Sequence, residues 1–554
     1  MKRSLVRLMV FALLASLTAA PALASDAAWF AQTGYPIVTD PAAQPKLSIF
    51  KSINDVEPED PNDNLWMQKA IADTGVSIDW ITVPGSSAGE RVQLMLAGNE
   101  LPDVFWDGIA RSHVLQYIDF GVFAPVEDLV DQYMPNLAGI YAKRPEYKAL
   151  SISPDGHIYG FPRVEEMHGL VMTPGPVYVY KPWLDQLGLE MPATLDAWVD
   201  MLYKMKEAGD LNGNGADDEY PISWDYNEGW DYIFGWVEAA YGALDVMTGA
   251  NNASNHLFIR EDKIQHAALE EGFQKTAQLF HQLYADGILS PDSFAPTVTG
   301  SSLHAQKLQQ ETPMIGVFQA WGTDGRVPAN LQFDYVSMPR VEGPAGKTGY
   351  IRNNSELFNT TLAVITVDCE NPELVARFVD YIMGPEQSVT ANWGAEGAVY
   401  VKDESGALRW DVDETGLYIK PKFDLEWWQL RSYSTIGGPN VVLNDYYDTV
   451  VEYPRDARRV FDEQTAGGKA ELLEEYEAVS PMVWFLPEEQ AQVDQIMPQI
   501  KNVFDVTLTR WIIDGGAESE FGAFKEQLAA AGLNKYLEIY QKAFDRYLEN
   551  MKGL

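Results

Sequence analysis

The residues best suited to chemistry form a short loop, from Asp210 to Glu219, in which oxygen-bearing side chains alternate with glycines. Ca²⁺ takes six to eight oxygen ligands, and an EF-hand loop supplies them from alternate positions around a glycine that allows a sharp turn. Gly215 stands at the turn position. Oxygens in this spacing are available at Asp210, Asn212, Asn214, Ala216 (through its carbonyl) and Asp218. Since nothing nearby indicates a catalytic centre, the spacing predicts a structural Ca²⁺ site.

The loop departs from an EF-hand after its fifth ligand position. Pro221 stands where the bidentate glutamate of an EF-hand is expected, so Glu219 would have to close the site two residues early. Helical periodicity precedes the loop over 195–207, but residues 220–224 are typical of extended chain because of Pro221. The alternative is an ordinary Asn-Gly turn after a helix.

One pattern for nucleophilic catalysis is present. Residues 85–89 fit G-x-S-x-G and lie between a predicted strand and a predicted helix, as a nucleophile elbow does. Ser87 followed by Glu90 also fits a capping box, which we favour. No H-E-x-x-H, C-x-x-C or P-loop pattern occurs, so zinc, redox and nucleotide chemistry lack support.

Tryptophans in predicted loops are the second notable feature. They fall beside glycines or at element ends, at Trp106, Trp224, Trp230, Trp321, Trp393, Trp427 and Trp428. Sugar rings present apolar C–H faces, so flat aromatic rings can stack on them while carboxylates, amides and arginines bond the hydroxyls. For any single tryptophan the alternative is packing in the core.

The N-terminal segment, the net charge and the cysteine count limit the cellular compartment and the classes of partner that fit this chain. A basic start, an apolar run and Ala22-Leu23-Ala24 indicate a signal peptide over residues 1–24 with no lipid-anchor cysteine, and hence a periplasmic protein. The net charge of −40 argues against nucleic acid and anionic membranes as partners. The single cysteine, Cys369, is expected to be a small buried hydrophobe.

The elements that must position these residues alternate between strand and helix. The expected order is a strand over 47–50, a helix over 62–73, a strand over 76–83, a helix over 88–97 and a strand over 104–106. This order is typical of an α/β lobe with a largely parallel sheet, where ligands bind beyond the carboxyl ends of strands. Trp106 and Asp107 therefore fall at an expected site edge. The pattern becomes mainly helical after about residue 418, and the length predicts two lobes.

Several ordered motifs carry a resemblance to a known family. They are Leu101-Pro102-Asp103-Val104, Asp155-Gly156-His157-Ile158-Tyr159, the Trp183 to Leu189 segment, the metal loop, Asn392-Trp393-Gly394-Ala395-Glu396-Gly397 and Trp511-Ile512-Ile513-Asp514-Gly515-Gly516. In order and spacing the chain resembles the large extracellular solute-binding proteins that supply oligosaccharides to ABC importers, a group that includes the alginate-binding proteins.

The resemblance implies an α/β, two-lobe periplasmic-binding-protein fold with a ligand cleft between the lobes and a helical C-terminal region. Lobe 1 is expected over 25–164 and 340–396, and lobe 2, which holds the loop, over 165–339 and 397–554. By the same resemblance, Glu219 joins the metal ligands named above. The residues expected to bind ligand are Trp106, Asp107, Tyr178, Trp321, Arg352, Trp393 and Glu396.

The predicted function is capture of a carbohydrate, most simply an oligosaccharide, by a monomeric binding protein that delivers it to a membrane permease without catalysis. The alternatives are a secreted carbohydrate-active enzyme, such as a glycoside hydrolase or lyase, and a peptide-binding protein of similar architecture.

Overall fold

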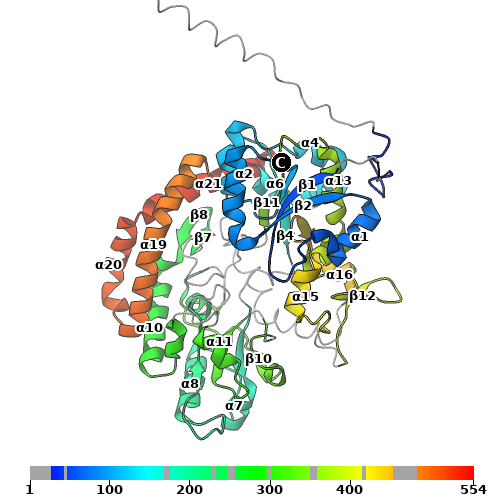
Figure 1. Ribbon diagram of the computed structural model, residues 1–554. Helices are drawn as coiled ribbons and strands as arrows, with labels where there is room; N and C mark the ends of the chain where they lie inside the picture. The colour runs from blue at the N-terminus through cyan, green and yellow to red at the C-terminus, as the bar shows by residue number, and fades with distance from the viewer. Residues whose placement is uncertain are drawn as a thin grey trace, which may run out of the picture.

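The computed structural model describes residues 27–40, 42, 46–166, 175–226, 232–245, 256–295, 302–320, 322–323, 325–349, 358–414, 419–452 and 483–554. These residues form two α/β lobes, one above the other in Figure 1. Helices from the C-terminal part run along the side of the second lobe, and the last of them ends against the first lobe. The predicted signal peptide lies outside the described residues.

The first lobe is built on a six-stranded sheet. Its strands, in spatial order, are β14 (Asn440–Val442), β4 (Phe161–Glu165), β11 (Phe358–Ile365), β3 (Val104–Trp106), β1 (Leu47–Ile53) and β2 (Ile78–Pro84). Strands β2, β1 and β3 are parallel, as the alternating pattern predicts, whereas β11 is antiparallel to both of its neighbours. The helices of the first lobe are α1 (Leu65–Thr74), α2 (Ala88–Gly98), α3 (Arg111–Tyr117), α4 (Glu127–Tyr133), α5 (Pro135–Lys143), α6 (Pro145–Ser151), α13 (Pro372–Ile382), α14 (Pro385–Trp393), α15 (Trp427–Ser434) and α16 (Asn444–Thr449).

Both faces of this sheet are buried. Alternate strand residues point to opposite sides, so Ile49 and Val104 join one apolar cluster while Phe50 and Phe105 join another. Helices α1, α4, α5 and α13 contribute to the first cluster, and α2 and α3 contribute to the second. The strands therefore read as nearly continuous apolar runs, which is typical of a sheet covered on both sides.

The second lobe has a smaller sheet. Its strands, in spatial order, are β10 (Tyr335–Ser337), β5 (Val177–Tyr180), β9 (Ile315–Gln319) and β6 (Tyr220–Ile222), and a hairpin of β7 (Leu257–Arg260) and β8 (Lys263–His266) stands apart. Its helices are α7 (Lys181–Leu187), α8 (Leu195–Glu207), α9 (Ile233–Glu238), α10 (Glu271–Ala285), α11 (Leu303–Leu308), α19 (Pro487–Asp514), α20 (Ala517–Ala530) and α21 (Leu533–Gly553).

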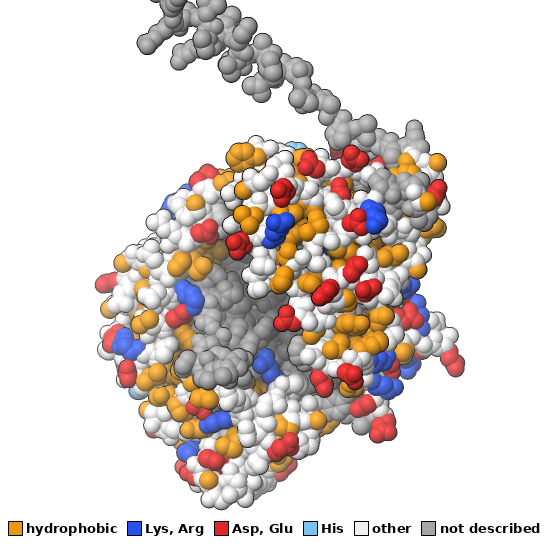
Figure 2. Space-filling model, viewed as in Figure 1, with side chains coloured by type: hydrophobic (Ala, Val, Ile, Leu, Met, Phe, Trp, Pro, Cys, Tyr) orange, Lys and Arg blue, Asp and Glu red, His pale blue; other side chains and the backbone are white. Residues whose placement is uncertain are grey.

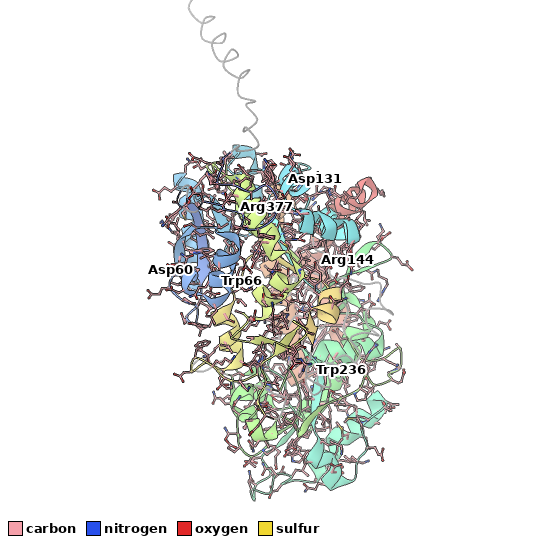
Figure 3. The ribbon with its side chains drawn as sticks, turned by 90° about the vertical axis from the view of Figure 1, so that its right-hand side faces the viewer. Asp60, Trp66, Asp131, Arg144, Trp236 and Arg377 are labelled. Carbon is pink, nitrogen blue, oxygen red and sulfur yellow. The ribbon has the colours of Figure 1, made fainter. Side chains whose placement is uncertain are left out.

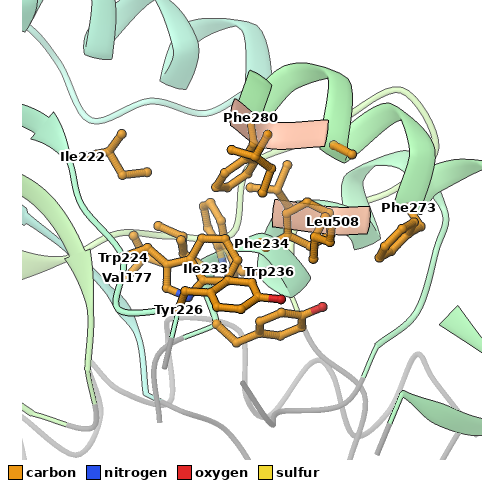
Figure 4. Packing of buried hydrophobic residues seen from close by; sticks show 14 of the residues in the cluster. Val177, Ile222, Trp224, Tyr226, Ile233, Phe234, Trp236, Phe273, Phe280 and Leu508 are labelled. Carbon is orange, nitrogen blue, oxygen red and sulfur yellow. The ribbon is translucent and has the colours of Figure 1, made fainter. Parts of the chain in front are cut away.

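Aromatic side chains fill the core of this lobe. Trp224 is fully buried and packs edge-on against Phe280 and stacked on Phe234 (Figure 4). Leu508 of α19 reaches the same core, so the C-terminal helices complete this lobe rather than forming a separate unit. Figure 3 shows Trp236 in this lobe and Trp66 in the other.

The predicted lobe boundaries need two corrections. Residues 340–349 belong to the second lobe, since Val341 lies in its core. Residues 397–452 belong to the first lobe, because β14 pairs with β4 and the small sheet of β12 (Tyr400–Lys402), β13 (Leu408–Trp410) and β15 (Val451–Glu452) packs on that core. Along the described residues the lobe therefore changes three times: after residue 166, after residue 349 and after residue 452.

Acidic side chains are spread over both lobes on the face shown in Figure 2 rather than gathered in one patch. Within the described part of the chain, we find no helix that is long and apolar enough to cross a membrane.

Candidate functional site

A cleft of about 360 Å³ opens at the edge of the first-lobe sheet, beside the carboxyl ends of β1 and β3. In Figure 1, α15 marks the side of this lobe that lies nearest the second lobe. All of the lining residues come from the first lobe, and most are polar. They are Lys51, Asn54, Glu57, Asp107, Arg163, Ala391, Asn392, Trp427, Arg431, Ser432, Thr435, Gly437, Gly438 and Asn440.

The turn after β3 shapes one wall of the cleft. Asp107 has φ +58° and Gly108 has φ +89°, so the chain reverses within two residues. Gly437 and Gly438 then lie against this turn. A Cβ on Gly437 would stand 3.1 Å from Asp107 Oδ2, and one on Gly438 would stand 2.1 Å from Trp106 Nε1. The second position therefore requires glycine.

A polar network forms the cleft floor around the buried Asn392. Arg163 Nη2 donates to Asn392 Oδ1 (2.8 Å), and Arg431 Nε donates to the Asn392 carbonyl (2.9 Å). Behind them, Glu165 accepts from the Tyr447 hydroxyl (2.6 Å) and from Asn392 Nδ2. Burial raises the pKa of Glu165 to about 7, although Tyr447 and the arginines oppose the shift. Burial, with repulsion from Arg163, lowers the pKa of Arg431 to about 10.

An aromatic stack supports this floor. Trp427, which lines the cleft, stacks on Trp393 at 6.4 Å and 16°, and on Trp410 at 6.2 Å and 27°. The Arg431 guanidinium lies 4.1 Å from the centroid of the Trp393 ring, and the Trp393 indole donates to the Tyr447 hydroxyl. Trp427 is thus held in place by two neighbouring indoles at the edge of the cleft.

Of the predicted ligand-binding residues of the first lobe, Asp107 lines this cleft. Trp106, one residue earlier, is fully buried between Trp80 and Phe378, because strand alternation turns it to the opposite side from its neighbours. Trp393 is 5% exposed and lies beneath Trp427 rather than at the cleft surface.

The other predicted ligand-binding residues lie apart from this cleft or outside the described residues. Glu396 is partly exposed and lies 3.9 Å from Lys402 Nζ, away from the lining. Tyr178 is 6% exposed in the second lobe, where its ring packs against Phe318. Trp321 and Arg352 fall outside the residues that the structure describes.

Most of the polar residues that line the cleft were not predicted from the sequence. Lys51 and Arg163 are charged residues inside apolar strands, which is a signal that could have marked them. Lys51 is 1% exposed and pairs with Glu57. No local sequence pattern marks Arg431 as a lining residue, because its contact with Asn392 depends on how α15 lies against α14.

The Asp210 to Glu219 loop joins α8 to β6 in the second lobe. Asp210 Oδ1 accepts from the backbone N–H groups of Gly213 (2.7 Å) and Asn214 (3.0 Å), and its Oδ2 accepts from Gly215 (2.8 Å). The side chain thus shapes the turn, as the first residue of a cation loop does. In the described part of the chain, however, no three carboxylate, histidine or cysteine side chains converge on one point.

Glu219 closes the loop. It is 4% exposed, and its carboxylate accepts from the backbone N–H groups of Asn212 (2.7 Å) and Asp218 (3.2 Å). The nearby Lys206 instead pairs with the exposed Asp217 (3.0 Å). Among the described residues no cationic side chain pairs with this buried carboxylate. In a loop whose other candidate ligands are all oxygens, such a carboxylate fits a hard cation.

Comparison with known proteins identifies the family. Residues 59–389 match the family described as bacterial extracellular solute-binding protein. The chain is 31% identical over 531 residues to FusA, a fructooligosaccharide ABC transporter substrate-binding protein of Streptococcus pneumoniae, with 93% of each chain covered. The chain belongs to this family. The match confirms the family resemblance that the ordered motifs carry.

Solved structures confirm the two-lobe fold. FusA of S. pneumoniae in complex with kestose superposes with a TM-score of 0.73 at 29% identity, covering 91% of this chain and all of that one. The alginate-binding protein AlgQ2, solved without calcium ion, gives 0.63 at 18% identity and 91% and 99% coverage, which shows a shared fold alone.

Proteins of this family bind solutes rather than convert them, and this chain is a binding protein and not an enzyme. The hydroxyl of Ser87, the residue at the centre of the G-x-S-x-G pattern, donates to the Pro84 carbonyl (3.0 Å). The predicted capping box is wrong, because the Ser87 side chain makes no cap bond to α2. Cys369 is partly buried, and desolvation raises its pKa to about 12, which leaves the thiol protonated and weakly nucleophilic.

Proposed function

We propose that this protein is the substrate-binding component of an ABC importer and captures an oligosaccharide in the first-lobe cleft. The similarity to FusA over nearly the whole chain carries the proposal. The cleft suits such a ligand because the exposed part of Trp427 offers a flat face, while arginine, amide and carboxylate groups around it can donate to and accept from sugar hydroxyls.

Capture requires the second lobe to close over the first. A ligand shifts the balance towards a closed state only if it binds that state more tightly, so contacts from both lobes are needed. The described cleft supplies the contacts of the first lobe. Tyr178, Trp321, Arg352 and Glu396 remain our candidates for further contacts, whereas Trp106 and Trp393 are buried away from the cleft surface.

The loop from Asp210 to Glu219 would hold a structural Ca²⁺. The ligands would be Asp210, Asn212, Asn214, the Ala216 carbonyl, Asp218 and Glu219, which would tie the end of α8 to the start of β6. A solved FusA structure is described as an EF-hand mutant, which supports a cation loop in this part of the family. The ion would brace the second lobe at a distance from the sugar.

Export would follow from the predicted signal peptide, and the exported protein would act in the periplasm as a monomer. The partners would be the oligosaccharide and the permease subunits of the inner membrane.

Calorimetric titration with neutral and uronic oligosaccharides, followed by chromatography of the mixture, tests the function. One-to-one binding without new products is expected, with kestose, the sugar named for FusA, as the first probe. Accumulating products would indicate a carbohydrate-active enzyme, and binding of peptides but no sugar would favour the peptide-binding alternative.

A further inference from the structure

Three consecutive residues are shared between the two lobes. Val483 and Phe485 are buried in the core of the second lobe, whereas Trp484 between them is buried in the core of the first, in the cluster of Phe50 and Phe105. The alternation is that of an extended chain with one lobe on each side. We call residues 483–485 the interlobe strap.

Polar contacts fix the strap to the first lobe. The indole Nε1 of Trp484 donates to the Leu150 carbonyl at the end of α6 (2.9 Å). Arg111 of α3 donates through Nη1 to the Val483 carbonyl (3.0 Å), and its guanidinium lies 5.8 Å from the centroid of the Trp484 ring. A buried indole with its N–H satisfied is held in one orientation.

The second lobe holds the same residue through its backbone. Arg546 of α21 donates through Nη2 to the Trp484 carbonyl (3.1 Å) and pairs with Glu489 of α19. The strap leads directly into α19. At the start of this helix, the Glu489 carboxylate accepts from the backbone N–H of Leu486 (2.9 Å). One residue therefore has its side chain fixed in one lobe and its carbonyl fixed by the other.

A solvent-open groove separates parts of the two lobes beside the strap. A cavity of about 650 Å³ lies next to Trp484, between Ser153, Pro154 and Gly156 of the first lobe and Lys542 and Asn550 of the second. Since close-packed interiors resist displacement, such a space is where two lobes can move relative to each other. The strap is the dense contact at the margin of this space.

We propose that Trp484 is a positioning residue that fixes the axis about which the lobes move. With the strap anchored in both cores, the open protein is limited to a rotation about that contact. Without the anchor the open state gains conformational freedom, which closure on a ligand must remove, so binding weakens although no sugar contact is lost. The consequence for binding rests on the proposed function, whereas the axis itself does not.

The test compares two tryptophan-to-phenylalanine variants. Trp484→Phe keeps an apolar ring but loses the bond to Leu150. Trp66→Phe is the matched control, since Trp66 is 3% exposed and donates to Thr390 Oγ1 (3.0 Å) within the first lobe alone. Spin labels on cysteines introduced at the exposed Leu94 and Glu190, one in each lobe, report the interlobe distance by pulsed electron resonance.

Without sugar, Trp484→Phe should broaden the distance distribution while Trp66→Phe leaves it as in the wild type. With kestose, Trp484→Phe should weaken binding at least threefold and Trp66→Phe should not. Equal distributions for the two variants would overturn the proposal, whichever sugar binds. Absence of sugar binding by the wild type, with a broadened distribution in Trp484→Phe, would instead contradict the proposed function and leave the axis standing.

Discussion

At the residue scale, the cleft floor combines two arginines with a buried carboxylic acid. Asp107 could be placed there from the sequence because it follows a strand that ends at a sheet edge. Its neighbour Trp106 could not be assigned correctly, since the same strand turns successive side chains to opposite sides and the helix above covers one of them. Arg163 and Arg431 meet only at Asn392, through elements far apart in the chain.

Glu165→Gln should change how stability depends on pH. The pKa of Glu165 is raised to about 7 by burial, so the folded protein holds a proton that the unfolded chain releases near pH 4.5. Its contribution to stability is therefore full below pH 4.5 and is lost as the pH rises to about 7. The loss approaches about 3 kcal/mol, at about 1.4 kcal/mol per pKa unit.

Urea unfolding at several pH values between 4.5 and 8 measures this effect. The free energy of unfolding of the wild type should fall with pH relative to that of Glu165→Gln, which has no proton to lose. Parallel curves for the two proteins would show that Glu165 is ionised in the fold throughout this range.

At the element scale, the strands of the regular alternation were predictable. The expected strand over 104–106 is confirmed as β3, because it is a compact apolar run between turn residues. Strand β14 was not predictable, since it has three residues and, among the described strands, pairs with β4, which lies far back in the chain. That one pairing moves residues 397–452 from the second lobe to the first.

Gly438→Ala should destabilise the first lobe strongly. Gly438 has φ +78°, and an added Cβ would stand 2.1 Å from the Trp106 ring nitrogen. We expect a loss of at least about 3 kcal/mol in the free energy of unfolding, from backbone strain and overpacking together.

Gly397→Ala is the control for backbone strain alone. It has φ +88° with no atom within 4 Å of the added Cβ, and should cost about 1 kcal/mol. Similar losses for the two variants in urea unfolding would mean that the contact with Trp106 is readily relieved.

Chelation should lower the melting temperature if the Asp210 loop holds Ca²⁺. A ligand present at about 1,000 times its Kd stabilises by about 4 kcal/mol, which corresponds to a shift of several degrees. Differential scanning fluorimetry with CaCl₂ and with EDTA measures this shift.

Two variants test whether the change in melting temperature arises from Ca²⁺ bound in the loop from Asp210 to Glu219. Glu219→Gln should abolish the response to CaCl₂, because it neutralises the carboxylate that closes the loop. Asp217→Asn should retain the response, since Asp217 is exposed and pairs with Lys206 outside the ligand set. An EDTA response that Glu219→Gln leaves intact would place the ion elsewhere.

At the scale of the whole molecule, the chain forms two lobes, and the polar cleft belongs to the first of them. Length and element alternation predicted both lobes, and the match to the solute-binding family confirms the fold. The lobe boundaries were partly wrong because the chain stays in the first lobe after residue 396, which no local pattern indicates.

We expect an oligosaccharide to bind in the first-lobe cleft against Trp427. Calorimetric titration of kestose into the wild type and into Trp427→Ala tests it most directly. We predict one binding site per wild-type molecule and at least tenfold weaker binding by the variant, which loses the stacking face. Binding of equal strength by the two proteins, or no binding by the wild type to kestose or any other oligosaccharide, would contradict the account.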